Sequence, residues 1–298
     1  MTDQDSPEFV PEETNEREPR PAPRASYSRR QELRSTRLEV GTVIGNTFSI
    51  WSRNLVPFSA LALLIYLPVL IIGYLFWEGA HTEQEVVRFK WIMWGAEQVF
   101  FASLLAGTLT YGVVMQLRGK RADIGNCVKI GLSRILHVFG VSILVALMSV
   151  LWFVPGYVVL QGGNIGLGAL LLSLAVLPLL IIMLTYYVAV PATVVERVGV
   201  IEALSRSAAL TKGLRMTIFG ILFLFGLLVF VIAIPFGVVI GFVIGTGVEM
   251  APSTFYVIQT LIGVLLAPLT AILPGVIYHD LRVGKEGVDV KDLAAVFE

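Results

Sequence analysis

Six apolar stretches, each long enough to cross a membrane as a helix, constrain this 298-residue chain more than any other feature. A helix rises about 1.5 Å per residue, so about 20 apolar residues cross a hydrocarbon core of about 30 Å. Lipid offers no partners for backbone polar groups, so only helices and closed barrels span it. We therefore predict an all-α, polytopic membrane protein with six transmembrane helices, near residues 55–77, 97–117, 138–160, 167–190, 217–246 and 254–278.

The distribution of basic residues predicts how these helices are oriented. Hydrophobic residues make up 56% of the chain and charged residues only 15%, a composition far from that of soluble domains. Of the 22 Lys and Arg residues, 20 fall on one side of a six-span threading, and only Arg88 and Lys90 fall on the other. The positive-inside rule then predicts a multi-pass protein of the cell (cytoplasmic) membrane with both termini in the cytoplasm.

Both ends of the chain differ from the apolar region. Residues 1–38 are rich in proline and charge and poor in large aliphatic residues, which predicts a disordered cytoplasmic tail. Its second half is rich in arginine, which can adhere to anionic lipid at about 1 kcal/mol per residue near the surface. Alternatively, this stretch is simply solvated and reinforces the orientation. We assign 39–282 to the transmembrane domain and 283–298 to a short cytoplasmic segment.

A pattern of one amphipathic stretch and two spans occurs three times. Apolar residues at helical spacing predict interfacial helices, and copies of a two-span unit should be related by an axis along the membrane normal. Chance similarity among apolar helices is the alternative. The third copy, 201–214, is the weakest, with Ile201, Leu204 and Ala208 on its apolar face. The first two faces comprise Val40, Val43, Ile44, Thr47, Phe48 and Trp51, and Ile124, Cys127, Val128, Gly131, Leu132 and Ile135.

Prolines and glycines within the spans predict where helices kink and pack. Each outward span contains a proline that can kink it, and kinks could open a ligand path or only aid packing. Two overlapping G-x-x-x-G steps in the fifth span predict a close helix contact, within this chain or with another. The prolines are Pro68, Pro155 and Pro235, and the glycines are Gly237, Gly241 and Gly245.

Charged residues gather at the predicted cytoplasmic boundary. Glu202 and Arg206 are four residues apart, as in an exposed helical ion pair. Glu196 and Asp280 could each pair with Arg206 or Arg282 and clamp the bundle. We interpret these five residues as structural interfacial charges, because structural ion pairs are commoner than catalytic ones.

These same residues carry a resemblance to a known group of proteins. The chain reads Glu196, then Glu202-Ala-Leu-x-Arg206-Ser, then Leu210-Thr-x-Gly213, and it ends its last span with Tyr278-x-Asp280-Leu-Arg282. This pattern resembles an uncharacterised bacterial family of six-span proteins, which is similar to the membrane domain fused to some glycerophosphodiester phosphodiesterases. The resemblance implies a stand-alone membrane domain. The catalytic barrel is absent from these residues, so the phosphodiesterase activity is not expected.

No catalytic, cofactor-binding or metal-binding motif is evident in the sequence. We therefore predict a non-enzymatic protein with a structural or organising role, membrane lipids as partners and no nucleic acid partner. A protein partner or a homo-oligomer is also compatible with the sequence. One alternative is a transporter or channel component for a small or amphiphilic substrate, such as a lipid. Another is a membrane subunit that recruits a soluble protein.

Overall fold

The computed structural model describes residues 38–79, 81–117, 124–247 and 251–286, and every regular element in these ranges is a helix. The all-α prediction is therefore confirmed for the described part of the chain. Contacts divide the chain between Arg34 and Ser35, and all described residues belong to the second unit. The predictions for the tail, and for most of the segment 283–298, concern residues outside these ranges.

Five described helices are long and apolar enough to cross a membrane, and a sixth is counted if one bent pair forms a single span. This agrees with a multi-pass helical membrane protein. The bent pair joins Gly125–Ser133 to Ile135–Leu151 at an angle of 61°. The five are α3 (Leu55–Trp77), the run Glu83–Leu117, the run Ile165–Val195, α12 (Arg215–Gly245) and α13 (Pro252–Glu286).

The third predicted span, 138–160, is broken in the structure. Helix α7 (Ile135–Leu151) ends after 17 residues, and α8 (Val154–Gln161) follows, with Pro155 in its first turn. Proline is well tolerated there because the first backbone N–H groups of a helix have no partner within the helix. The other two prolines expected to kink a span, Pro68 and Pro235, lie inside the uninterrupted helices α3 and α12.

The second span is longer than predicted. It comprises α4 (Glu83–Ala96), a π-helical turn η1 (Glu97–Phe101) and α5 (Ala102–Leu117). Thr82 and Glu85 form a capping box: the backbone N–H of Thr82 donates to Glu85 Oε2 at 2.8 Å, and the N–H of Glu85 donates to Thr82 Oγ1 at 3.4 Å. This cap starts the helix 14 residues before Glu97, so Glu97 lies inside a continuous helical run and not in a loop.

Three short amphipathic helices pack in a cyclic order that follows the predicted repeat. Helix α2 (Val40–Arg53) packs against α13, α6 (Ile124–Ser133) packs against α5, and α11 (Val200–Thr211) packs against α9 (Ile165–Tyr186) and α10 (Ala189–Val195). Each short helix therefore contacts the second span of the repeat before its own, and α2 of the first repeat contacts the second span of the third repeat. The buried face of α2 includes Val43, Ile44 and Thr47, as expected.

The buried face of the third amphipathic helix differs from the predicted one. Leu204 is buried as predicted, but Ile201 is 71% exposed, and the other residues that α11 buries are Ala203, Ser207, Leu210 and Thr211. Two of these residues hold it in place: the hydroxyls of Ser207 and Thr211 donate to the carbonyl oxygen of Thr185, at 2.8 and 3.2 Å. A polar face satisfied by a neighbouring carbonyl is not visible in a hydrophobic pattern.

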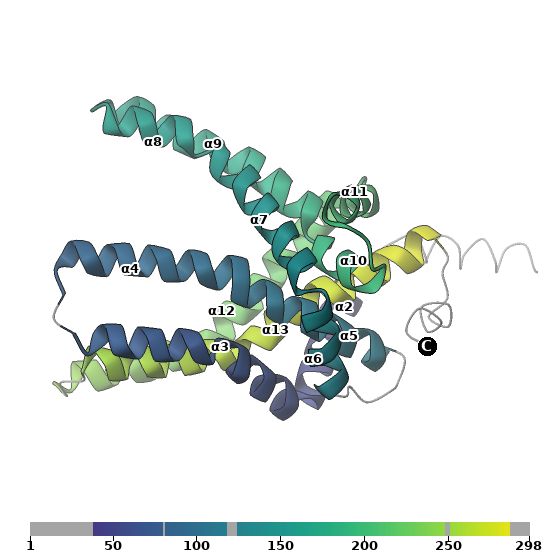
Figure 1. Ribbon diagram of the computed structural model, residues 1–298, viewed down its shortest axis with the longest axis horizontal. Coiled ribbons are helices and arrows are strands. Elements are labelled where there is room, and N and C mark those ends of the chain that lie inside the picture. The colour runs from purple at the N-terminus through teal and green to yellow at the C-terminus, as the bar shows by residue number, and fades with distance from the viewer. Residues whose placement is uncertain (1–37, 80, 118–123, 248–250, 287–298) are drawn as a thin grey trace, which may run out of the picture. The chain divides into compact units, whose positions relative to one another are not determined.

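Within this unit, the hairpin turns and the short helices lie at opposite ends of the spans (Figure 1). We call the end with the turns α3–α4, α8–α9 and α12–α13 the hairpin side, and the end with α2, α6 and α11 the collar side. Many large apolar residues on the spans are exposed. Only 17% of the most apolar 18-residue stretch is buried inside the protein, both in α9–α10 and in α12. Lipid is the solvent that such surfaces require.

The predicted contact at the G-x-x-x-G steps is not found within the described chain. Gly237, Gly241 and Gly245 are exposed, and a Cβ atom added at any of them would meet no atom within 4 Å. Close glycine packing occurs between α8 and α9 instead. A Cβ on Gly156 would lie 2.9 Å from the backbone nitrogen of Leu172, and a Cβ on Gly168 would lie 2.9 Å from that of Leu160.

Candidate functional site

Two groups of polar residues stand out, one at each end of the spans. On the collar side, Arg206 of α11 donates from Nε to both carboxylate oxygens of Glu196 at 2.9 Å, and from Nη2 to Glu286. Tyr278 of α13 donates to Glu196 Oε1 at 2.6 Å, and Arg282 Nε donates to Glu286 Oε2 at 3.2 Å. We call these five residues the collar cluster. It joins the end of α10, α11 and the end of α13.

The charges of the collar cluster are partly screened from solvent. Side-chain exposure is 15% for Glu196 and 28% for Arg206. Burial by itself would lower the pKa of Arg206, but hydrogen bonds to Glu196 and Glu286 outweigh it and raise that pKa. A raised pKa means that this contribution to stability is present below the ordinary arginine pKa and is lost only at strongly alkaline pH. The guanidinium therefore remains charged at physiological pH.

The structure brings together some of the predicted interfacial charges and separates others. Glu196, Arg206 and Arg282 belong to the collar cluster. The pair between Glu202 and Arg206 is not formed, because Arg206 is occupied by Glu196 and Glu286 while Glu202 is exposed. Asp280 accepts from neither arginine and lies 3.0 Å from His279 Nδ1 instead. The cluster also includes Glu286, which sequence reasoning did not consider.

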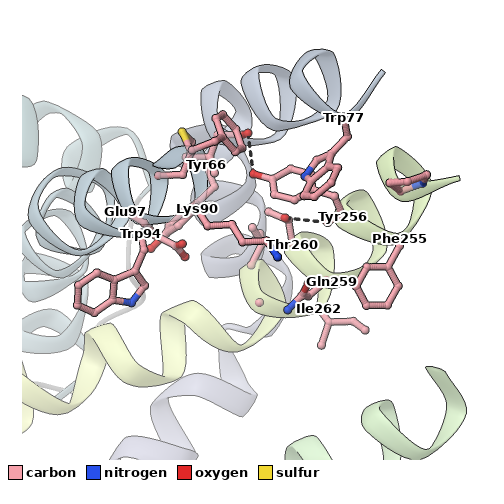
Figure 2. Close-up of a pocket in the computed structure, with 16 residues that line it drawn as sticks. Tyr66, Trp77, Lys90, Trp94, Glu97, Phe255, Tyr256, Gln259, Thr260 and Ile262 are labelled. Carbon is pink, nitrogen blue, oxygen red and sulfur yellow. Dashed lines mark hydrogen bonds between the residues drawn. The ribbon is translucent and has the colours of Figure 1, made fainter. Parts of the chain in front are cut away.

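A pocket of about 740 Å³ lies on the hairpin side between α3, α4–η1 and α13. Figure 2 shows Lys90 and Glu97 extending from α4–η1 toward α13, opposite Gln259 and Thr260. Aromatic side chains form much of the wall, including Trp77, Trp94 and Tyr256. The pocket therefore combines an apolar lining with one cation and one carboxylate, as ligand sites commonly do.

Ring contacts between α3 and the second span show where Glu97 lies along the membrane span. The rings of Phe76 and Phe89 stack with centroids 3.7 Å apart, and those of Tyr66 and Phe101 are 5.8 Å apart. Glu97 lies between Phe89 and Phe101 in the chain, so it is level with the part of α3 between Phe76 and Tyr66. Because α3 has 23 residues, about 35 Å, Glu97 lies inside the span and not at its end.

Sequence reasoning missed this carboxylate because it started the second span at residue 97, which put Glu97 at the edge of the span, whereas the helical run begins at Glu83. Ionisable residues within spans are costly and commonly mark functional sites. Two signals in the sequence could have located it: the Thr82-x-x-Glu85 capping box and the aromatic residues that continue after it. The π-helical turn that begins at Glu97 is a second unusual feature, since such turns are frequent at functional sites.

Tyr256 shapes the pocket through a close approach to α3. Its hydroxyl donates to the carbonyl oxygen of Val69 at 3.1 Å. The ring lies directly on Gly73, where an added Cβ would come within 2.0 Å of it. Only glycine leaves room for this ring, so Gly73 and Tyr256 together fix one wall of the pocket.

Among the described residues, no group of three or more metal-ligating side chains is found. His81, whose Nδ1 lies 4.0 Å from Glu85 Oε2, stacks on Phe76 with ring centroids 3.9 Å apart, and its other ring nitrogen lies 2.6 Å from the Phe76 carbonyl oxygen. Glu85 caps α4, so both groups already have structural contacts.

Comparisons with known proteins found no matching family model, no matching curated protein and no matching solved structure. The resemblance seen in the sequence therefore stays a prediction.

Proposed function

We propose that this chain is a non-enzymatic protein of the cytoplasmic membrane that binds a lipid or a similar amphiphile in the pocket on its hairpin side. The observation that carries the proposal is a carboxylate, Glu97, facing a large aromatic-lined pocket at the level of a membrane span. We place the collar side in the cytoplasm because most of the basic residues lie on that side of the spans. The pocket then opens toward the outer leaflet.

The lining supports an amphiphile over a small polar solute. Aromatic and aliphatic side chains such as Trp77, Phe255 and Val264 suit an acyl chain, whereas Lys90 and Glu97 suit a polar group. Trp77 ends α3, and tryptophan is typical of the membrane interface, where lipid headgroups meet chains. Binding of this kind is compatible with transport, and also with a role in organising lipid at the protein surface.

The proposal is tested by filling the pocket. Gly263 lines it, and a Cβ added there meets no atom within 4 Å, so a larger side chain can start at this position without a clash at its Cβ. We expect the wild-type protein to retain a phospholipid through detergent exchange, as counted by native mass spectrometry. Gly263→Phe should reduce the retained fraction about tenfold, because its ring occupies the space that the chain needs.

Gly237→Phe is the matched control, since Gly237 is also an open position on a span but does not line the pocket. It should retain lipid like the wild type. Equal lipid retention in all three proteins would contradict binding in this pocket.

A structural role is a second candidate, favoured by the collar cluster. Its hydrogen bonds and ion pairs connect three helical elements from distant parts of the chain. The two proposals are compatible, because the cluster and the pocket lie at opposite ends of α13.

A further inference from the structure

We infer that the pocket selects a single-chain phospholipid with a free hydroxyl between its phosphate and its acyl chain, that is, a lysophospholipid. The inference rests on the proposed function and adds the chemical class of the ligand. It follows from three properties of the pocket: two opposite charges that do not pair with each other, their order along one helix, and the apolar lining beneath them.

Lys90 and Glu97 line the same pocket and yet form no ion pair among the described residues. The ammonium of Lys90 lies 5.8 Å from the centroid of the Trp77 ring, and its side chain is exposed. Glu97 is half-buried, with no hydrogen-bond partner described for its carboxylate. Both groups are therefore available to a ligand.

The two charges are arranged in a fixed order from the interface inward. They are seven residues apart on one helical run, which corresponds to about 10 Å along the axis and nearly the same face. Lys90 contacts Trp77 near the end of α3, whereas Glu97 is level with the segment between Phe76 and Tyr66. A ligand that enters from the hairpin side meets the cation first and the carboxylate second.

This order matches the groups of a lysophospholipid. Its phosphate can accept from the Lys90 ammonium at the interface, where headgroups of the leaflet lie. In the same molecule a glycerol hydroxyl can donate to Glu97, deeper in the pocket, because the glycerol unit lies between the phosphate and the acyl chain. The chain then continues toward Tyr66 and Val264, which are buried and line the deeper part of the pocket.

The carboxylate explains why a free hydroxyl is preferred. A carboxylate has only acceptor oxygens, so its ligand must donate a hydrogen bond. A glycerol hydroxyl of a lysophospholipid donates, whereas the ester oxygens of a diacyl phospholipid can only accept. Placing an ester beside Glu97 would leave two acceptors facing each other in a partly buried site, which is costly.

Three probes with the same palmitoyl chain test this inference by native mass spectrometry in a non-ionic detergent. They are lysophosphatidic acid, the diacyl phosphatidic acid, and monopalmitoylglycerol, which has hydroxyls and no phosphate. The wild-type protein should bind lysophosphatidic acid at least about tenfold more tightly than either of the others, the difference that one hydrogen bond to a charged group supports.

Variants of the two charged residues test whether Lys90 recognises the phosphate and Glu97 recognises the hydroxyl. Lys90→Gln should weaken the binding of lysophosphatidic acid about tenfold and leave the binding of monopalmitoylglycerol nearly unchanged. Lys90→Arg should restore the preference for the phosphate. Glu97→Gln, whose amide also donates, should bring the affinities of the lyso and diacyl lipids closer together. Arg88→Gln serves as a control, because Arg88 is an exposed cation on the same helix that does not line the pocket.

The possible failures can be told apart. If all three probes bind the wild type equally and Gly263→Phe blocks them all, the pocket binds amphiphiles but does not select this class, and the inference is wrong. An unchanged probe preference in both Lys90→Gln and Glu97→Gln, in proteins with wild-type thermal stability, also overturns it. If no probe binds, or if Gly263→Phe leaves binding intact, the proposed function itself fails.

Discussion

Replacing Glu196 with alanine is expected to lower the free energy of unfolding by about 2 kcal/mol. Glu196 accepts from Arg206 and from Tyr278, and its side chain is only 15% exposed. Its removal leaves the Nε group of a partly buried guanidinium and the hydroxyl of a buried tyrosine without their acceptor, while Nη2 of Arg206 keeps Glu286. The estimate is below that for a fully buried pair, because solvent reaches Arg206. Thermal unfolding in one detergent is the measurement.

Glu202→Ala is the matched control for this prediction. Glu202 is a glutamate close to Arg206 in the sequence, but it is exposed and Arg206 makes its contacts elsewhere. We expect it to change stability by less than about 0.5 kcal/mol. A structural role for the collar cluster would be contradicted if Glu196→Ala unfolded at the same temperature as the wild type, or if Glu202→Ala were destabilised as much as Glu196→Ala.

The composition of the collar cluster shows what local reasoning can predict and what it cannot. Spacing on one helix can suggest only ion pairs three or four residues apart, such as Glu202 with Arg206. The partners that Arg206 takes are 10 and 80 residues away: Glu196 was one of the predicted alternatives, whereas Glu286 on α13 was not considered. Which distant carboxylate reaches an arginine depends on how α11 packs against α13, which the sequence of either helix does not contain.

The spans themselves were accessible from the sequence because the requirement for apolar length is local. Predicted boundaries agree closely for α3 and α12, where no charge interrupts the run. The second span was placed too late because α4 carries charged residues that lower its mean hydropathy. The same misplacement removed Glu97 from consideration, so the pocket could not be anticipated.

The glycine pattern failed for a different reason. A G-x-x-x-G step makes close packing possible, but it does not supply a neighbouring helix. Helix α12 leaves its stripe open within the described chain. Gly156 and Gly168 each pack closely against the facing helix, because the short α8–α9 turn brings α8 and α9 together. Connectivity, and not the glycine spacing, decides where backbones approach.

Opposite effects are therefore expected from the same substitution at two span glycines. Gly168→Ala places a methyl group 2.9 Å from the backbone nitrogen of Leu160, so α8 and α9 must move apart. Overpacking of this kind costs about 1–3 kcal/mol. Gly241→Ala meets no atom within 4 Å and should be neutral or slightly stabilising, because alanine favours helix over glycine by about 1 kcal/mol.

Thermal unfolding gives the sign of each effect, and hydrogen exchange shows where it arises. In Gly168→Ala the increase in amide exchange should be confined to α8 and α9, since their contact is the one that the methyl group disrupts. Equal stability of the two variants would contradict the close packing of this hairpin. A destabilised Gly241→Ala variant with a lower molar mass by light scattering would have a different meaning. The open stripe on α12 would then join two copies of the chain, because only a contact outside the described residues could make that position sensitive.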